Sequence, residues 1–424
     1  MNSTTPRSPK TKLIALLVSL ILGLLVCEVL LRLRPTLLPM DFRAQYPMRG
    51  IEFLRPHLLD ELAVDELSVP LVSEPFSGIP PADLKQYGIA PRGVQLDAER
   101  YPRVHTPSDA LGLPNPGLPS SAEVVLVGDS MLLAASSLRP PGLVQRFAQE
   151  TGLSCYSLGV PGIGPQHEAS LLAGPGLSLK PKLVLWFFFG GNDLNDAKQV
   201  LEAMQAGKRV RSELDDYRST PFSYLFAFVN WALRGEQQVE AEETKPALPP
   251  LLLPSPRGEP IPLWLHPSYL ARTALTRGQW EAHKAWAVST ASIAESHRKT
   301  EAQGGRFVLV YLPSKAEALL PLLAQQEELL WRTLNFDLEQ DLSLSPGQAL
   351  AQMLAQRGSL DAALGAFCER EGIPYFSASA ALEAQARAGE AGYFATDTHW
   401  MPTGQAVVLE ALLRFLETNA LLAH

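Results

Sequence analysis

The chain has few cysteines, histidines and charged residues for its 424 residues. Its 3 cysteines contain no Cys-x-x-Cys pair, which excludes a disulfide-dense scaffold and a cysteine-based zinc site. Cys155 and Cys368 could form one bridge, although isolated cysteines are usually small buried hydrophobes. The 8 histidines show no ligand-like spacing, so we expect no metal and no cofactor. A net charge of −8 excludes a protein that coats nucleic acid, and we expect no nucleic-acid partner.

Proline, in contrast, is abundant. The chain contains 36 prolines, roughly 8% against a usual ~5%, which predicts long connecting segments. An apolar share of 46% excludes wholesale disorder. A mean hydropathy of +0.02 excludes a protein with many membrane spans but allows one.

One apolar run stands at the N-terminus. Residues 13–27 carry no charge, and with Glu28 and the apolar residues that follow, 13–31 would form a helix of about 28 Å. That length just crosses a bilayer, and we interpret residues 1–35 as an uncleaved anchor. A cleaved signal peptide is the alternative, although no Ala-x-Ala site follows. Basic residues lie on both sides, so they do not decide the orientation.

Four apolar runs predict the strands of a buried parallel sheet, at 123–127, 154–158, 182–189 and 306–311, with a short fifth strand at 373–376. Each of the first three runs ends in a glycine-containing turn. Ligands of open α/β sheets bind outside the carboxyl ends of the strands. We therefore expect three glycine-marked loops to gather at one sheet edge.

Helical patterns separate these strands, and Ser379 is a plausible N-cap for one of them. The expected helices cover 58–67, 142–150, 165–172, 222–233, 316–334, 346–368, 380–388 and 403–416.

Four features at or near strand ends carry chemistry. Ser130, in a Gly-Asp-Ser turn, can be a nucleophile if a base is in reach. Gly162 can lend a backbone N–H to a ligand, and Asn192 can offer an uncharged amide donor. Asp397 and His399, one residue apart, can form an acid–base pair. Each has a plainer reading: a helix cap, a glycine turn, a side-chain turn and a structural histidine. Together they could assemble one acyl-transfer site.

In this order the features resemble the SGNH (GDSL-type) hydrolase superfamily. Gly128-Asp129-Ser130 is similar to its first block, with Ser130 as nucleophile, and Gly162 to the oxyanion glycine of the second. Ser157 stands where the family often has Asn. Gly191-Asn192-Asp193 is similar to the third block, with Asn192 as oxyanion donor, and His399 to the base of the last. The resemblance implies a three-layer α/β/α sandwich.

The last block departs from the common Asp-x-x-His pattern, because position 396 is Thr and the acid is Asp397. Asp397-x-His399-Trp400 instead resembles a branch that includes alginate and other exopolysaccharide O-acetyltransferases. A Pro-x-Lys element similar to Pro313-Ser-Lys315 often occurs in that branch, whose members are often membrane-anchored and periplasmic. The resemblance covers about 121–202 and 303–420.

These observations predict the organisation of the chain. After the anchor we expect an extended arm over 36–120, a catalytic domain built from 121–202 and 303–424, and a proline-rich insertion over 203–302. The catalytic domain is expected to be periplasmic, held at the inner membrane by a single helix.

The expected function is that of a serine acyl-ester enzyme with a Ser130–His399–Asp397 triad and an oxyanion hole at Gly162 and Asn192. It would be an O-acetyltransferase or acetylesterase acting on a cell-envelope or exported polysaccharide, with an acyl donor or acceptor as partner. Two alternatives stay open: a GDSL-type lipase or thioesterase acting on lipid esters, and a catalytically silent glycan-binding or assembly subunit.

Overall fold

The computed structural model describes residues 9–33, 76–77, 105–106, 109, 111, 113–205, 223–234, 248–256, 258–336 and 344–422. The helix expected over 58–67 lies outside the described residues. Two short antiparallel pairs accompany the main sheet: β1 (Phe76–Ser77) with β2 (His105–Thr106), and β6 (Leu251–Leu253) with β7 (Ile261–Leu263).

The central sheet has five parallel strands in the order β4-β3-β5-β8-β9. Their bounds are β3 Val124–Gly128, β4 Cys155–Gly159, β5 Leu183–Phe189, β8 Arg306–Leu312 and β9 Tyr375–Ser377. From β3 the chain first moves outward to β4 and then returns past β3 to β5. The direction of winding therefore reverses between β3 and β5, which is where doubly wound sheets bind ligands.

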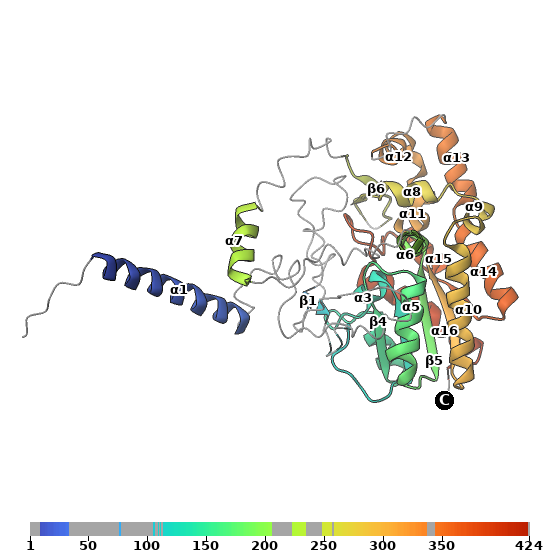
Figure 1. Ribbon diagram of the computed structural model, residues 1–424. Helices are drawn as coiled ribbons and strands as arrows, with labels where there is room; N and C mark the ends of the chain where they lie inside the picture. The colour runs from blue at the N-terminus through green and yellow to red at the C-terminus, as the bar shows by residue number, and fades with distance from the viewer. Residues whose placement is uncertain are drawn as a thin grey trace, which may run out of the picture.

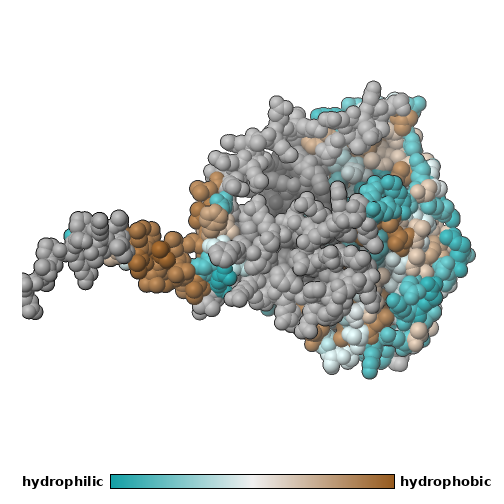
Figure 2. All heavy atoms as spheres, viewed as in Figure 1, coloured by the Kyte–Doolittle hydropathy of each residue, from teal (hydrophilic) through white to brown (hydrophobic). Residues whose placement is uncertain are grey.

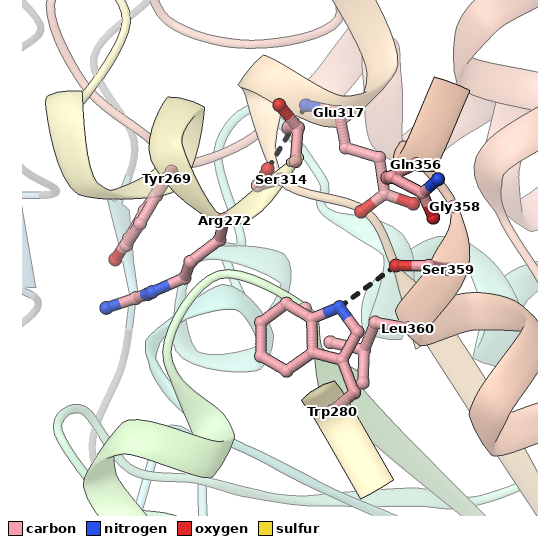
Figure 3. A pocket seen from close by; sticks show the side chains of 11 residues that line it. Tyr269, Arg272, Trp280, Ser314, Glu317, Gln356, Gly358, Ser359 and Leu360 are labelled. Atoms are coloured by element: carbon pink, nitrogen blue, oxygen red, sulfur yellow. Dashed lines mark hydrogen bonds between the residues drawn. The ribbon is translucent and has the colours of Figure 1, made fainter. Parts of the chain in front are cut away.

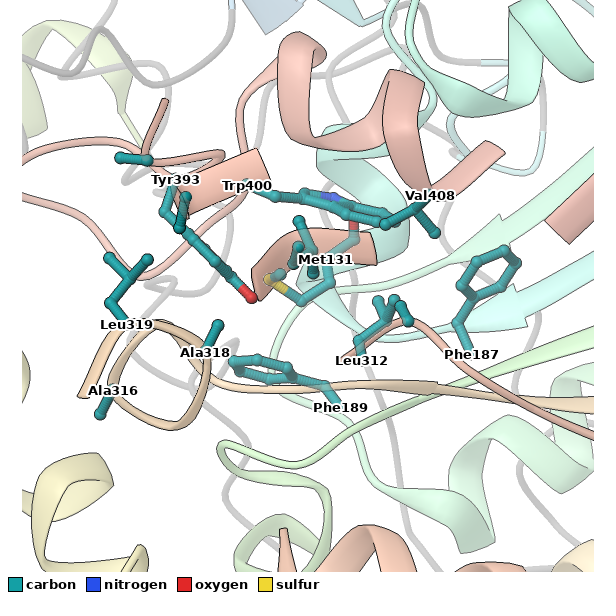
Figure 4. Packing of buried hydrophobic residues seen from close by; sticks show 14 of the residues in the cluster. Met131, Phe187, Phe189, Leu312, Ala316, Ala318, Leu319, Tyr393, Trp400 and Val408 are labelled. Atoms are coloured by element: carbon teal, nitrogen blue, oxygen red, sulfur yellow. The ribbon is translucent and has the colours of Figure 1, made fainter. Parts of the chain in front are cut away.

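Alternate side chains along the strands enter two separate cores, one on each face of the sheet. Leu126 and Phe187 belong to one core, and Val125 and Trp186 to the other. Full burial of such side chains contributes about 1.5–3 kcal/mol each. Figure 4 shows part of the first core, where Trp400 packs near Met131, Phe187 and Phe189.

Helices cover both faces. The first core includes side chains from α3 (Ser130–Ala135), α4 (Leu143–Thr151), α11 (Lys315–Leu323), α15 (Ser379–Arg387) and α16 (Pro402–Thr418). The second includes side chains from α5 (Pro165–Leu171), α10 (Trp286–Ala302) and α14 (Ser359–Glu371). The predicted α/β fold, a three-layer sandwich on a parallel sheet, is confirmed.

Three helix predictions need correction. The expected helix over 346–368 is two helices, α13 (Pro346–Gln356) and α14, because Gly358 adopts the left-handed conformation (φ 80°) and ends the regular backbone. The stretch 316–334 is divided into α11 and α12 (Glu327–Leu334) by a 3₁₀ turn. The N-cap of α15 is Ala378, and Ser379 instead donates from its hydroxyl to Asp361 Oδ2 at 2.8 Å.

The segment expected to be an insertion contributes to both cores where it is described. Leu253 and Leu263 of the β6–β7 pair are buried in the first core, and Ile293 of α10 in the second. Two short helices, α8 (Pro267–Arg272) and α9 (Arg277–Glu281), lie between them in sequence. The last part of this segment thus supplies the helical crossover between β5 and β8.

The end of the expected arm packs on the edge strand β4. The Asn115 side chain accepts from Ser157 N at 2.8 Å and donates to Ser157 O at 2.9 Å, so one amide group pairs with the strand as a neighbouring backbone would. Buried Asp109 accepts from Asn115 Nδ2 and from the Tyr156 hydroxyl at 2.7 Å. Cys155 on β4 and Cys368 on α14 are free thiols, so the possible bridge does not form.

At the N-terminus, α1 (Pro9–Leu33) is one long helix beside the body (Figure 1). Its window Ala15–Arg32 has a mean hydropathy of 2.4, and none of it is buried. The helix is long and apolar enough to cross a membrane, as a signal sequence also can be. Figure 2 shows its hydrophobic surface without a protein cover.

Candidate active site

Ser130 begins α3 directly after β3, at the point where the winding of the sheet reverses. Asp129 is the N-cap, and its Oδ1 accepts from Met131 N at 2.8 Å. The Ser130 hydroxyl, which is half-buried, donates to Asp129 Oδ2 at 3.4 Å. The sharp turn from strand to helix therefore presents the hydroxyl at the carboxyl edge of the sheet, next to a helix N-terminus.

The second glycine loop follows β4 and lies close to two helices. A Cβ at Gly159 would come within 2.6 Å of Leu133 N in α3, and a Cβ at Gly164 within 2.7 Å of Ala197 N in α6 (Asp193–Gln205). Only glycine permits approaches this close. Gly162 between them has a φ of 67°, in the left-handed region. The structure thus brings the loops after β3, β4 and β5 together.

The candidate oxyanion donors are arranged around this junction. The backbone N–H groups of Ser130 and Gly162 have no hydrogen-bond partner within the described part of the chain. Asn192 donates one amide N–H to Asp196 Oδ2 at 2.8 Å, which fixes its side chain and leaves its second N–H. Unpartnered donors beside a hydroxyl are the groups that a developing oxyanion needs.

His399 and Asp397 form a tight pair. Asp397 Oδ1 lies 2.5 Å from His399 Nδ1 and also accepts from His399 N at 2.6 Å, so one carboxylate oxygen holds both the ring and its backbone. Burial acts to raise the pKa of Asp397, but the imidazole, these hydrogen bonds and the nearby Lys315 ammonium outweigh it, and the pKa lies below its usual value. Asp397 is therefore ionised at neutral pH, and it orients the imidazole through Nδ1.

Trp400 ties this pair to the serine helix. Its indole Nε1 donates to Met131 O at 2.9 Å, one residue after Ser130. The ring is fully buried, and Figure 4 shows it packed close to Met131 and Tyr393. The Tyr393 hydroxyl in turn donates to Pro313 O at 2.9 Å. Packing and two hydrogen bonds thus position the His399 loop against α3 and the turn after β8.

No hydrogen bond joins the Ser130 hydroxyl to His399 in the described residues. The two side chains belong to segments that Trp400 holds together, but the serine proton points to Asp129. Catalytic hydrogen bonds are often long before a substrate binds, so the arrangement is compatible with a serine–histidine pair that closes on the substrate.

Lys315, the lysine of the Pro-x-Lys element, lies buried beside the loop that carries Asp397. Its ammonium donates to the carbonyl oxygens of Phe394, Ala395 and Asp397, at 3.0, 3.2 and 2.6 Å. Only 2% of the residue is exposed, and burial lowers its pKa to about 7 although Asp397 acts in the opposite direction. A buried cation that holds three carbonyls of one loop fixes the position of Asp397.

Segments of the expected insertion support the same loops, which the sequence did not indicate. Trp264 N donates to Ala395 O at 2.8 Å. Arg272 donates to Gly191 O and lies 5.2 Å from the centre of the Tyr269 ring. The insertion therefore buttresses the loops that carry Asp397 and Asn192.

A second group of carboxylates lies buried behind the junction: Asp129, Glu168, Asp193 and Asp196. Burial raises the pKa of Glu168 and of Asp193 well above the usual range, and repulsion by the neighbouring carboxylates Asp129 and Asp196 adds to this. Both Glu168 oxygens and Asp193 Oδ1 have no hydrogen-bond partner in the described part of the chain. No set of three metal-ligating side chains forms among the described residues.

A small polar cavity adjoins Gly190 and lies between α8, α9 and α14 (Figure 3). Its volume of about 10 Å³ holds about one water molecule. Trp280 Nε1 donates to Ser359 Oγ at 3.1 Å at its wall. Glu317 also lines it, and burial raises the pKa of this residue to about 7. The cavity is too small for a sugar or an acyl chain.

No family model and no curated protein matches the chain. Solved structures similar to it include a candidate acylhydrolase from Bacteroides fragilis (12% identity, 71% of this chain, 91% of that chain, TM-score 0.34). A GDSL-like lipase from Bacteroides thetaiotaomicron is 11% identical over 70% of this chain and 88% of its own, with a TM-score of 0.32. An α/β hydrolase from the metagenome of Lake Arreo, Spain, is 11% identical over 72% and 98%, with a TM-score of 0.33.

Proposed function

We propose that the chain is a serine-dependent acyl-ester enzyme of the SGNH type. The observation that carries the proposal is the tether from the Asp397–His399 pair to the serine helix, made by the Trp400 Nε1 hydrogen bond to Met131 O. A nucleophile candidate, an oriented imidazole and unpartnered N–H donors then belong to one sheet edge, as acyl transfer requires.

In the first half-reaction, His399 Nε2 takes the proton of the Ser130 hydroxyl as the oxygen attacks the ester carbonyl. Asp397, which accepts from Nδ1, fixes the ring and stabilises the imidazolium. The N–H groups of Ser130 and Gly162 and the second amide N–H of Asn192 bind the oxyanion. The imidazolium then returns its proton to the leaving alcohol, and an acyl-serine forms.

In the second half-reaction, His399 removes a proton from water or from a sugar hydroxyl, which attacks the acyl-serine. Water gives an esterase and the sugar gives an O-acyltransferase. We assign the reaction to acetyl groups of a cell-envelope or exported polysaccharide, with α1 as an inner-membrane anchor and the body in the periplasm. Two observations support this assignment: the Asp-x-His-Trp block and the apolar N-terminal helix.

Covalent labelling tests the nucleophile. We expect a fluorophosphonate to label the purified full chain on Ser130 and to leave Ser130→Ala unlabelled, with labelling strongly reduced in His399→Ala. Ser345→Ala is a matched control, because Ser345 also lies at a helix N-terminus but has no role in this site. An unlabelled wild-type chain, or label on another serine, would contradict the proposal.

The acyl group and the acceptor are tested separately. With p-nitrophenyl esters we expect acetate to be preferred, whereas a preference for long chains would favour the lipase or thioesterase alternative. Adding an oligosaccharide to the aryl acetate assay should yield acetylated sugar. Acetate release that is indifferent to the sugar, with no acetylated product, would identify an esterase instead of a transferase.

A further inference from the structure

Helix α7 (Tyr224–Arg234) has an apolar stripe that is exposed to solvent. Phe226 and Leu233 are each 69% exposed and Val229 is 44% exposed. Their spacing of three and four residues places them on one face of the helix. Tyr224 and Ala227 are buried. A helix with one buried side and one bare apolar side needs a second apolar surface.

The first turn of α7 is attached to α1 by the Glu28 carboxylate. Glu28 Oε1 accepts from Tyr224 N and Oε2 from Leu225 N, each at 3.0 Å. Ser223 Oγ donates to Glu28 Oε2 at 2.9 Å and accepts from Phe226 N at 3.1 Å. The first three N–H groups of α7 therefore have acceptors outside the helix backbone. The Glu28 carboxylate also places a negative charge at the positive end of the α7 dipole.

Arg32 completes the joint between the two helices. Its Nε donates to Glu28 Oε1 at 2.7 Å, and its guanidinium lies 5.0 Å from the centre of the Tyr224 ring. Both residues belong to the last turns of the apolar window Ala15–Arg32. At 1.5 Å per residue, Glu28 lies about 6 Å inside the end of that window. The start of α7 is thereby held at the depth where a spanning helix leaves the hydrocarbon.

We propose that α7 is an interfacial helix, whose Phe226, Val229 and Leu233 side chains insert into the lipid bilayer where α1 leaves it. The inference rests on the membrane anchoring included in the proposed function. Lipid is the expected partner because α7 is joined to α1, the one helix of the described residues that can span a bilayer. The joint lies at the end of the apolar surface of α1 (Figure 2). Interfacial helices bury one apolar face about 5–10 Å deep in this region.

The joint also gives Glu28 a role. A carboxylate within an apolar helix is costly in a bilayer unless it is paired and hydrogen-bonded. Here it pairs with Arg32 and caps α7. Removal of residues 1–28 as a signal peptide would leave the start of α7 without these partners. The retained anchor and the interfacial helix therefore form one unit.

Lipid quenching tests the position of α7 in the full chain. Cys27→Ser removes the exposed thiol, and bimane is attached to Val229→Cys or Leu233→Cys in nanodiscs of phosphatidylcholine and phosphatidylglycerol. Brominated phosphatidylcholine should reduce the emission of both labels at least twofold. The control is Glu410→Cys on α16, a site whose side chain is 67% exposed, and its emission should not change.

Quenching at 229 and 233 no stronger than at 410 would overturn the inference. So would labels that are shielded from aqueous iodide but not quenched by brominated lipid, which would indicate a protein partner. A mature chain that lacks Glu28 by mass spectrometry would also overturn it. Glu28→Ala should at least halve the lipid quenching at 233, whereas Ser19→Ala should not.

Hydrolysis of a soluble aryl acetate separates this inference from the proposed function. Glu28→Ala should leave that rate within twofold of the wild-type rate. A chain with no esterase activity but with lipid-quenched labels would refute the enzyme and keep the interfacial helix. An active chain with water-exposed labels would do the reverse.

Discussion

Two sets of buried carboxyl groups lie at the same edge of the sheet, and their pKa values are shifted in opposite directions. Asp397 is held by His399 and Lys315, and its pKa lies below the usual value. Glu168 and Asp193 lie beside other carboxyl groups that repel their negative charge, and their pKa values are raised. Burial is nearly complete in both sets. Burial alone therefore favours the neutral form of a carboxyl group, whereas cationic and hydrogen-bonding partners from other segments keep it charged.

The two sets give opposite pH dependence of stability. Asp397 stabilises the fold fully above its ordinary pKa of 3.8, and this contribution is lost as the pH falls through its lower native pKa. Glu168 retains in the native state a proton that the unfolded chain releases above 4.5. Its contribution therefore declines as the pH rises from 4.5 to its raised native pKa.

We expect the largest loss of activity when the charge of Asp397 is removed. Asp397→Asn should lower kcat about 10³–10⁴-fold, because the imidazole loses its counter-charge and its preferred tautomer. Steady-state kinetics on an aryl acetate measure this. Asp361→Asn is the matched control, since that carboxylate accepts from Tyr375, Ser377 and Ser379 at the far strand. Equal losses in the two variants would remove Asp397 from the mechanism.

Removal of the Lys315 ammonium should weaken the arrangement that holds Asp397 in place. In Lys315→Met three loop carbonyls lose their donor, and we expect kcat to fall about 10–100-fold with KM changed less than threefold, because Lys315 positions Asp397 without touching substrate. Thermal unfolding should also occur at lower temperature. A folded variant with wild-type kcat would show that the loop holds its position without the ammonium.

Loss of the Trp400 Nε1 hydrogen bond to Met131 O should have a smaller effect on catalysis. Trp400→Phe keeps most of the buried ring but loses the bond to Met131 O, at a cost of about 1–3 kcal/mol in stability, and kcat should fall up to about tenfold. Trp280→Phe loses a comparable bond to Ser359 Oγ away from the triad. We expect it to lower stability only. Unchanged kcat in both variants would show that the Trp400 bond is purely structural.

Substitution of the neutral carboxyl group of Glu168 should have the smallest effect on activity. Glu168→Gln has nearly the same shape and carries no charge, so kcat should stay within twofold of the wild-type value. Its melting temperature should exceed that of the wild type by a few degrees at pH 9 but not at pH 5, because the variant has no proton to lose. Calorimetry at both pH values checks this. A variant destabilised equally at both would mean that the carboxyl group serves as a hydrogen-bond partner.

Much of the sheet could be predicted from local sequence. The runs at 123–127, 182–189 and 306–311 match β3, β5 and β8 to within one residue at each end, because each is a continuous apolar stretch closed by glycine or proline. The ends of helices were harder to predict. One apolar pattern covers both α13 and α14, and only the left-handed backbone of Gly358 locates the break between them. The segment 203–302 was harder still, because its proline content hid a crossover helix and the residues that buttress two site loops.

The candidate site shows the same division. Residue types and their order along the chain were enough to single out Ser130, Gly162, Asn192, Asp397 and His399, since acyl transfer needs a nucleophile, a base and neutral donors. The sequence could not show that Asn192 would be fixed by Asp196, or that Glu168 and Asp193 would be buried beside other carboxyl groups. Those facts depend on which loops pack together.

The sequence by itself determined where the chain forms buried strands, where glycine permits sharp turns, and which groups could react. These are local properties of backbone and side chain. The tertiary structure decided the protonation and placement of those groups: Lys315 reaches the Asp397 carbonyl across 82 residues, and Trp400 reaches Met131 across 269. Charge stabilisation and hydrogen bonding act over a few ångströms of space whatever the separation along the chain, so only the folded arrangement sets them.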